Sequence, residues 1–332
     1  MTINRVLTSG VDSEYVLTDL AAHLRAKGWD VTELDFGQFK GDPRPVLDQL
    51  KHEQVAYITS AHTNLTTLVA SVIAPKFVEL YPNYLSPLEI LRYVQPKVSL
   101  YIPHDLLTPF GDTNLNEYRF LDLFDYILSP FPDPALQATL GNTVEVIQAG
   151  WIKHAQHSAE RVQAMQNSAT KPRVTLFISM LEHLRWRYGN EGVFDYFAPL
   201  LNENVTVKLP AWRDVEQIEA IFKARSTAQV YPASGNSINL IAESDLVLCN
   251  GASSIHAEAN LMGCPTICLL DNEAVTIEDQ KKKLEHFPSV FFHDYRTRDK
   301  VPFQLIVTAL EAGRKTPAKP FDFGLIEDIL SQ

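Results

Sequence analysis

Short apolar runs alternate with amphipathic segments along most of the chain. In the first half the apolar runs fall at residues 4–8, 29–36, 55–59, 98–102, 124–128 and 144–148. Residues 15–26 place Leu17, Leu20 and Leu24 on one face of a helix, which Gly28 ends. This alternation predicts a series of strand–helix–strand units, which build a mostly parallel sheet.

The alternation is interrupted once and then resumes. Residues 155–170 are polar and predict a helix or a linker. Further strands are predicted at residues 174–178, 205–208, 228–231, 246–248, 266–270 and 290–292, and helices at residues 303–313 and 323–330.

We therefore predict an α/β protein with two Rossmann-like, doubly wound domains that face each other across a cleft. The expected boundaries are residues 1–155 for the N-terminal domain, 156–171 for the linker, 172–316 for the C-terminal domain and 317–332 for a C-terminal helix. Whether this helix packs back on the N-terminal domain is left open. Ligands are expected beyond the C-terminal ends of the strands.

Composition narrows the class of protein. The chain has 332 residues, of which 45% are hydrophobic and 21% charged, as is typical of globular proteins. A net charge of -11 predicts no binding of nucleic acid. A local basic patch for a membrane surface is still allowed. Cys249, Cys264 and Cys268 match no zinc spacing and predict buried, reduced thiols of a cytoplasmic protein.

One stretch carries the strongest chemical signal. Residues 243–270 read as a strand, a turn of small residues, a helix, a tight turn and a second strand. The turn contains Asn250, Gly251, Ser253 and Ser254, and either serine can cap the helix. A helix N-terminus behind such a turn binds phosphate through backbone N–H groups and the helix dipole. The alternative is an ordinary N-cap on a buried helix.

Two such halves, with residues 245–254 (DLVLCNGASS) and 258–265 (EANLMGCP) in the second, resemble the GT-B glycosyltransferase architecture. The resemblance is greatest to CDP-glycerol glycerophosphotransferase-like and UDP-N-acetylglucosamine 2-epimerase-like proteins. It implies a transferase that moves a glycosyl or glycerophosphoryl group from a nucleotide-diphosphate donor, held by the C-terminal domain, to an acceptor hydroxyl on the N-terminal side. It also implies that Glu258 holds the ribose hydroxyls.

The chain departs from both families at their catalytic positions. Residues 271–278 (DNEAVTIE) lack the arginines that the epimerases carry there, which argues against epimerisation. Residues 207–210 (VKLP) lack the histidine of the glycerophosphotransferase Lys-apolar-His-Pro motif. Residues 101–105 (YIPHD) supply His104 without the glycine that follows it in that family. These departures favour an alternative, a catalytically reduced GT-B-like binding or accessory protein.

The remaining candidates each have a second interpretation. His104 is either the general base for the acceptor hydroxyl or a locally bonded loop histidine. Lys208 neutralises the diphosphate or keeps its amine in water, and Glu258 binds ribose or is a solvated or capping residue. His256 is interpreted as solvent-facing or structural. Loop positions alone suggest Ser234 as a base contact and Ser9, Gly10 and His62 as acceptor or donor contacts, with Arg185 and Arg187 as further phosphate or surface residues.

We expect no cofactor and no metal ion, because no carboxylate pair has metal-ligand spacing. A nicotinamide dehydrogenase is disfavoured, since residues 6–14 (VLTSGVDSE) lack the G-x-G-x-x-G fingerprint. The expected setting is cytoplasmic synthesis of cell-surface polysaccharide. Peripheral association with the inner face of the membrane and homodimer formation are left open.

Overall fold

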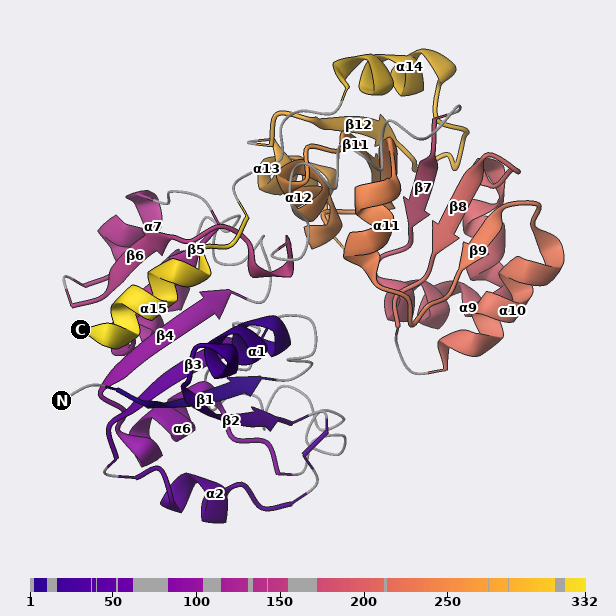
Figure 1. Cartoon of the computed structure of the whole chain (residues 1–332). Coiled ribbons are helices and arrows are strands. Elements are labelled where there is room, and N and C mark those ends of the chain that lie inside the picture. The colour runs from indigo at the N-terminus through magenta and orange to yellow at the C-terminus, as the bar shows by residue number, and fades with distance from the viewer. Residues whose placement is uncertain are drawn as a thin grey trace. The chain divides into compact units, whose positions relative to one another are not determined.

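The computed structural model of the chain contains two compact units (Figure 1). Unit 1 comprises Met1–Gln156 and Lys319–Gln332, and unit 2 comprises His157–Ala318. The structure describes residues 3–10, 17–36, 38–39, 41–51, 53–61, 83–103, 115–130, 134–141, 143–154, 172–211, 214–273, 275–285, 287–313 and 320–332.

Unit 1 is built on a six-stranded parallel sheet with the order β2-β1-β3-β4-β5-β6. Its strands are β1 (Arg5–Gly10), β2 (Asp30–Asp35), β3 (Val55–Ala61), β4 (Val98–Pro103), β5 (Tyr126–Ser129) and β6 (Glu145–Gln148). β1 pairs with β2 on one side and with β3 on the other, so the strand order reverses between β1 and β3. Ligands of open α/β sheets bind at such reversals.

Helices cover both faces of this sheet. The helical elements of unit 1 are α1 (Thr18–Ala26), α2 (Arg44–Asp48), α6 (Pro87–Val94), η2 (Leu115–Leu123), α7 (Pro134–Thr139), η3 (Ile152–His154) and α15 (Phe323–Ser331). Val6, Ile58 and Leu100 point to the face that α1 and α15 cover. Leu7 and Tyr57 point to the opposite face, where they pack with residues of α2 and α6. The strands alternate between two cores because successive side chains of a strand face opposite ways.

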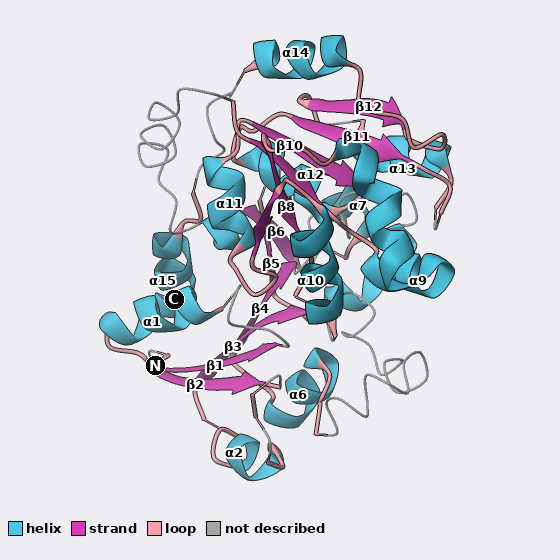
Figure 2. Cartoon of the chain, turned by 90° about the vertical axis from the view of Figure 1, so that its right-hand side faces the viewer, coloured by secondary structure: helices cyan, strands magenta, loops and turns pink. Residues whose placement is uncertain are grey.

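The last helix belongs to unit 1 although unit 2 precedes it in the sequence. Residues Ile326, Ile329 and Leu330 of α15 join the core around α1. His23 of α1 bonds Glu327 at 2.6 Å, and its ring stacks on Phe323. Figure 2 shows α1 and α15 side by side. Unit 1 is therefore assembled from the two ends of the chain.

Unit 2 contains a second six-stranded parallel sheet, with the order β12-β11-β10-β7-β8-β9. Its strands are β7 (Val174–Phe177), β8 (Val205–Lys208), β9 (Gln229–Tyr231), β10 (Leu246–Asn250), β11 (Thr266–Leu270) and β12 (Val290–Asp294). This is the Rossmann order, and its reversal lies between β7 and β10. β10 and β11 are buried along their whole length, as expected for central parallel strands.

The helices of unit 2 also lie on both faces. They are α9 (Leu181–Phe197), η4 (Ala198–Leu200), α10 (Val215–Arg225), α11 (Ser237–Glu243), α12 (Ser254–Leu261), α13 (Ile277–Leu284) and α14 (Phe303–Ala312). α9, α10 and α14 pack on one face of the sheet, and α11 and α12 on the other. Gly189, with φ 70° and ψ 173°, interrupts α9 and divides it into two halves.

The predicted α/β fold with two Rossmann-like units is confirmed. Each predicted apolar run overlaps a strand of one of the two sheets. The expected linker, residues 156–171, lies outside the described residues. Within the described residues, no helix has both the length and the apolar character needed to cross a bilayer.

Candidate functional site

The strand reversal of unit 2 is held together by Asn250, the last residue of β10. Its Oδ1 accepts a hydrogen bond from the backbone N–H of Ser179 at 2.7 Å, and its Nδ2 donates to the carbonyl of Ser179 at 3.1 Å. The hydroxyl of Ser179 donates in return to the carbonyl of Asn250. Asn250 is buried, so these bonds fix the end of β7 beside the end of β10. The side chain expected to contact diphosphate thus binds the neighbouring loop.

Gly251 makes the turn that follows. Its φ of 65° lies in the left-handed region, where a side chain is strained. A Cβ here would lie 3.4 Å from Sδ of Met180 and 3.9 Å from Oε1 of Gln280. Glycine is therefore favoured here by the backbone conformation, whereas the two neighbouring side chains leave room for a Cβ at van der Waals distance.

The imidazole of His256 is hydrogen-bonded to this turn. Its Nε2 lies 3.1 Å from the carbonyl of Gly251, and its Nδ1 lies 3.0 Å from Oγ1 of Thr266. Complete burial lowers the pKa of His256 to about 4, so the ring is neutral near pH 7. Nε2 must then donate to the carbonyl and Nδ1 must accept from the threonine hydroxyl. The interpretation of His256 as solvent-facing is wrong, and the structural one is confirmed.

The turn leads into the N-terminus of α12. Ser253 is the N-cap, and its hydroxyl accepts from the backbone N–H of Ile255 at 3.4 Å. Ser254 is the first helical residue, and both serines are partly exposed. The positive end of the helix dipole therefore lies at the surface beside Gly251.

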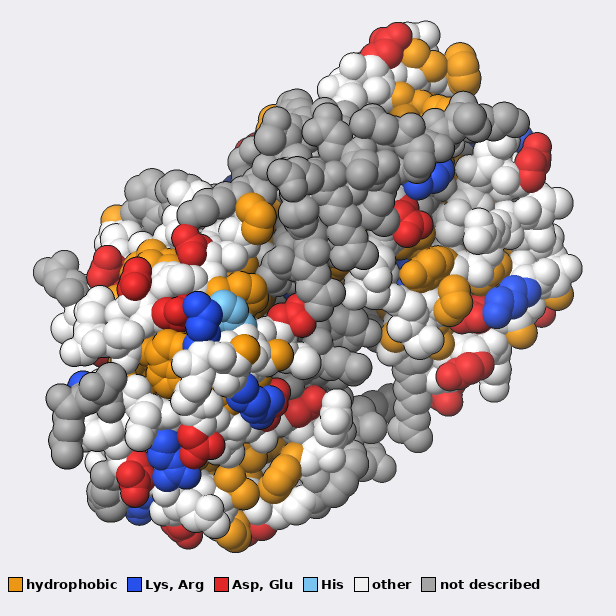
Figure 3. Space-filling view, in the orientation of Figure 1, with side chains coloured by type: hydrophobic (Ala, Val, Ile, Leu, Met, Phe, Trp, Pro, Cys, Tyr) orange, Lys and Arg blue, Asp and Glu red, His pale blue; other side chains and the backbone are white. Residues whose placement is uncertain are grey.

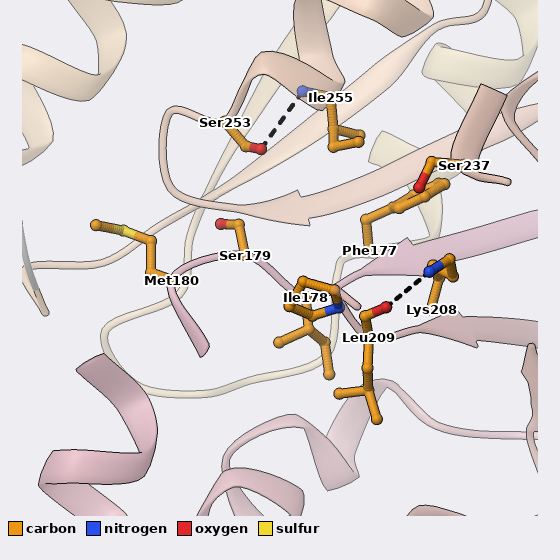
Figure 4. A pocket seen from close by; sticks show the side chains of 10 residues that line it. Phe177, Ile178, Ser179, Met180, Lys208, Leu209, Ser237, Ser253 and Ile255 are labelled. Carbon is orange, nitrogen blue, oxygen red and sulfur yellow. Dashed lines mark hydrogen bonds between the residues drawn. The ribbon is translucent and has the colours of Figure 1, made fainter. Parts of the chain in front are cut away.

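A pocket of about 150 Å³ opens next to this helix end (Figure 4). Its lining comes from the ends of β7 and β8 and from the first residues of α11 and α12, namely Phe177, Ile178, Ser179, Met180, Lys208, Leu209, Pro210, Ser237, Ser253 and Ile255. One pocket thus joins the capping serine of α12 to the amine of Lys208.

Lys208 is buried at the end of β8. Its amine donates to the carbonyls of Leu209 at 2.8 Å and Ala233 at 2.5 Å. Burial lowers the pKa of Lys208 to about 8, and nearby Glu219 partly opposes that shift. The amine is therefore largely cationic at neutral pH. The alternative interpretation of Lys208, with its amine in water, is wrong.

The loop after β9 contributes Ser237 to the pocket. Ser234 is exposed and is not among the lining residues. The backbone N–H of Ala233 donates to Oε2 of Glu219 at 3.0 Å, so Glu219 and Lys208 hold both polar groups of that residue. Asn236 caps α11 by accepting from the N–H of Ile238 at 2.8 Å. This places Ser237 at the pocket wall.

Glu258 lies on the second turn of α12. Its side chain is buried, with only 3% of the residue exposed. The interpretation of Glu258 as a solvated residue is therefore wrong. Its expected contact with ribose hydroxyls stays a prediction.

Three residues that the sequence reasoning did not name surround the other side of the turn. Gln280 of α13 is buried, and its Nε2 donates to the carbonyls of Asp271 and Val275. These bonds orient the amide so that Oε1 faces Gly251 without a hydrogen-bond partner in the described structure. Asp271, at the end of β11, accepts from the phenol of Tyr196 at 2.6 Å, and burial raises the pKa of Asp271.

The third of these residues is His183, on the first half of α9. Its Nε2 is buried and has no hydrogen-bond partner within the described part of the chain. His183 is also close enough to Asp271 to lower the pKa of that carboxyl, against the effect of burial. The spacing along the sequence gives no sign that residues 183, 271 and 280 meet at one edge.

Unit 1 presents a smaller candidate site at the ends of β1 and β3. Ser9 is buried, and its hydroxyl lies 2.7 Å from the phenol of Tyr57 and 3.2 Å from Oγ1 of Thr59. Ser60, which pairs in register with Gly10, has a buried hydroxyl without a partner among the described residues. The hydroxyl of Ser9 is thus bonded within the unit, and Gly10 is the last residue of β1. The candidates His62 and His104 lie outside the described residues.

Metal binding requires several ligating side chains close together. Among the described residues, no three His, Cys, Asp or Glu side chains gather closely enough to hold a metal ion.

Comparisons with known proteins identify the fold. No protein-family model matches the chain, and no curated protein matches its sequence. A UDP-GlcNAc 2-epimerase from Methanocaldococcus jannaschii, solved in complex with UDP-GlcNAc and UDP, matches 98% of this chain and 99% of its own, with a TM-score of 0.54 and 14% identity. The glycosyltransferase SnogD from Streptomyces nogalater matches 99% of both chains, with a TM-score of 0.51 and 13% identity. The chain therefore has the GT-B fold, as the sequence resemblance implied.

Proposed function

We propose that this protein is a GT-B-type transferase that moves a glycosyl (or glycerophosphoryl) group from a nucleotide-diphosphate donor to an acceptor hydroxyl. The observation that carries the proposal is the arrangement at the end of β10. There the capping serine of α12 and a buried lysine line one pocket at the strand reversal of a Rossmann-type sheet, next to the Gly251 turn.

The diphosphate is assigned to the N-terminus of α12. Backbone N–H groups and the helix dipole favour an anion there, and the hydroxyls of Ser253 and Ser254 add donors. The cationic amine of Lys208, in the same pocket, offsets the charge that develops on the leaving diphosphate. A metal ion is not needed for that step in this proposal.

The nucleoside is assigned to the pocket between β7, β8 and α11. Its walls are largely apolar, with Phe177, Leu209 and Ile255 among them, and suit the face of a base. Ser237 supplies a hydroxyl at the rim. Glu258 is retained as the ribose contact that the resemblance implies.

The transferred group is assigned to the β11 side of the Gly251 turn. Oε1 of Gln280 can accept a hydrogen bond from a hydroxyl of that group, and the Asp271 carboxyl lies at the end of the neighbouring strand. His104 remains our predicted base for the acceptor proton. We expect the reaction to occur on the cytoplasmic side during synthesis of cell-surface polysaccharide, with nucleotide-linked donor and hydroxyl acceptor as partners.

A second candidate function is a GT-B-like binding or accessory protein with reduced catalysis. One observation favours it. Leu209 and Pro210 line the pocket at the position where the resembling glycerophosphotransferases carry a histidine. Such a protein would bind nucleotide weakly or not at all and would form a stable complex with another protein.

Calorimetry with UDP-, GDP- and CDP-linked compounds tests the proposal. We expect the wild-type protein to bind one nucleotide class, and Lys208→Met to weaken that binding at least tenfold. Lys282→Met, on the exposed face of α13, is the matched control and should bind as the wild type does. If no nucleotide binds to the folded protein, the transferase proposal is wrong. Measurable group transfer by the wild type would remove the accessory-protein alternative.

A further inference from the structure

The first half of α9 carries a large side chain that is not buried in the core of unit 2. Trp186 is 82% exposed, which makes it the most exposed large hydrophobic side chain of the described residues. We propose that its indole is a stacking platform for a saccharide ring of the acceptor, beside the donor site. The proposal rests on the proposed function, because that function places a donor at the Gly251 turn.

The path of this helix puts Trp186 at the ligand edge of unit 2. Met180, directly before α9, has its sulfur against Gly251 at the end of β10. Further along the first half of α9, Arg187 and Tyr188 contact Glu273, which follows β11. Since β10 lies between β7 and β11, this stretch crosses the end of β10. In Figure 2, α9 lies on the side toward which the arrowheads of β11 and β12 point.

The helical segment that carries Trp186 is anchored by contacts on both sides of the indole. Leu181 and Leu184 are buried in the core of unit 2. The guanidinium of Arg187 lies 2.8 Å from the carboxylate of Glu273, and the phenol of Tyr188 donates to the same carboxylate at 2.6 Å. Gly189 then ends this half of the helix. An exposed aromatic ring on an anchored segment loses little conformational freedom when a ligand stacks on it.

A polar partner stands next to the indole. The rings of His183 and Trp186 have centroids 6.0 Å apart, and Nε2 of His183 is one of the buried atoms without a hydrogen-bond partner in the described structure. A saccharide presents an apolar ring face and hydroxyls around its rim. Trp186 suits the ring face, and the imidazole suits one hydroxyl.

The position favours a saccharide over the base of the nucleotide. The apolar pocket assigned to the base lies toward β8, where Lys208 and Ser237 line it. The part of α9 that carries Trp186 runs in the opposite direction, toward β11. This is the side of the Gly251 turn to which the transferred group is assigned. A ring that meets an exposed side chain there arrives from solvent, as an acceptor does.

Among the described residues, two other large hydrophobic side chains are exposed without such surroundings. Phe303 is 78% exposed at the start of α14, where Figure 3 shows hydrophobic side chains over the helix. Leu123 is 61% exposed at the end of η2 in unit 1. Single exposed apolar side chains are common on protein surfaces. Phe303 therefore serves as the matched control for Trp186.

Tryptophan fluorescence tests the platform without requiring turnover. The wild type, Trp186→Phe and Phe303→Ala are titrated with methyl β-D-glucopyranoside, methyl N-acetyl-β-D-glucosaminide, glycerol and uridine. We expect at least one ring glycoside to change the emission of the wild type and of Phe303→Ala, and not that of Trp186→Phe. Glycerol and uridine should change none. The absence of any glycoside effect in the wild type overturns the proposal, as does a Trp186-dependent response to uridine.

Kinetics and calorimetry provide the second readout. With a saccharide acceptor, Trp186→Ala should raise the acceptor KM by ~10-fold, the size of one aromatic stacking contact, and leave the nucleotide Kd within twofold. An unchanged acceptor KM overturns the proposal. If no nucleotide binds but the glycoside response still depends on Trp186, the saccharide platform stands and the transferase proposal fails.

Discussion

Asn250 and Ser179 share three hydrogen bonds, which join the ends of β7 and β10 at the strand reversal of unit 2. The amide of Asn250 uses its acceptor on the N–H of Ser179 and its donor on the C=O. An aspartate has the same shape and keeps only acceptors. The substitution Asn250→Asp therefore tests whether the hydrogen bonds between Asn250 and Ser179 support the site.

We expect Asn250→Asp to lower the free energy of unfolding by ~1–3 kcal/mol, because the carbonyl of Ser179 loses its donor and faces a carboxylate at a buried position. Nucleotide affinity should fall as well, since the turn follows directly. Chemical denaturation and calorimetry measure the two effects. Asn204→Asp, at an exposed position, should change neither quantity. Full stability of Asn250→Asp would contradict the structural role given to this amide.

Gly251→Ala should impair nucleotide binding more than it impairs folding. The positive φ strains any side chain by ~1–3 kcal/mol, and the new Cβ would lie in van der Waals contact with Met180. The measurements are thermal unfolding and nucleotide Kd. Gly28→Ala is the control, because Gly28 has φ 98°, open space around it and a place in unit 1. Equal loss of nucleotide binding in both variants would assign the effect to general strain.

Lys208 should give stability and binding opposite responses to pH. Its pKa of about 8 lies below the ordinary 10.5, so the unfolded chain binds more protons between these values. The unfolding free energy of the wild type, measured relative to Lys208→Met, should therefore rise from about pH 8 to 10.5. Nucleotide affinity should fall over the same range as the amine loses its charge. An affinity that is constant with pH would remove Lys208 from phosphate binding.

His256 should contribute an acid sensitivity. Its pKa of about 4 lies below the ordinary 6.5, so the unfolded chain binds the extra proton between pH 6.5 and 4. The wild type should lose stability as the pH falls through this window. His256→Gln retains a donor for Gly251 and should lack this part of the loss, as measured by urea unfolding at pH 7 and 5. His293→Gln, at the edge strand β12, should keep the wild-type profile.

Gln280→Met should separate binding of the nucleotide from binding of the transferred group. The substitution removes the unpartnered Oε1 that faces Gly251. We expect an unchanged Kd for the nucleoside diphosphate and ~10-fold weaker binding of the complete donor. Gln229→Met, on the exposed part of β9, is the control. If both ligands bind Gln280→Met as they bind the wild type, the transferred group lies elsewhere.

The sequence predicted the sheets well because their strands are continuous apolar runs bounded by turn residues. β10 and β11 are buried throughout, and such strands stand out from amphipathic helices. The turn at Gly251 was found for a related reason. A glycine and two serines between a buried strand and a helix are a local signal.

The rest of the site depends on contacts that no local pattern contains. His256 lies in the first turn of α12, and only the tertiary structure reveals that both its ring nitrogens are bonded. Gln280 and His183 come from helices 97 positions apart, and their importance lies in atoms left without partners. For Asn250, the residue type was noted, but the partner of its amide is 71 residues away.

The return of α15 to unit 1 bears on how the chain matures. Leu20 and Leu24 share a core cluster with Ile326 and Leu330, which are synthesised after all of unit 2. Unit 2 can therefore complete its core during synthesis, whereas unit 1 emerges first and is finished last. Until α15 is synthesised, the apolar surface that it covers on unit 1 is exposed, and chaperones bind such surfaces.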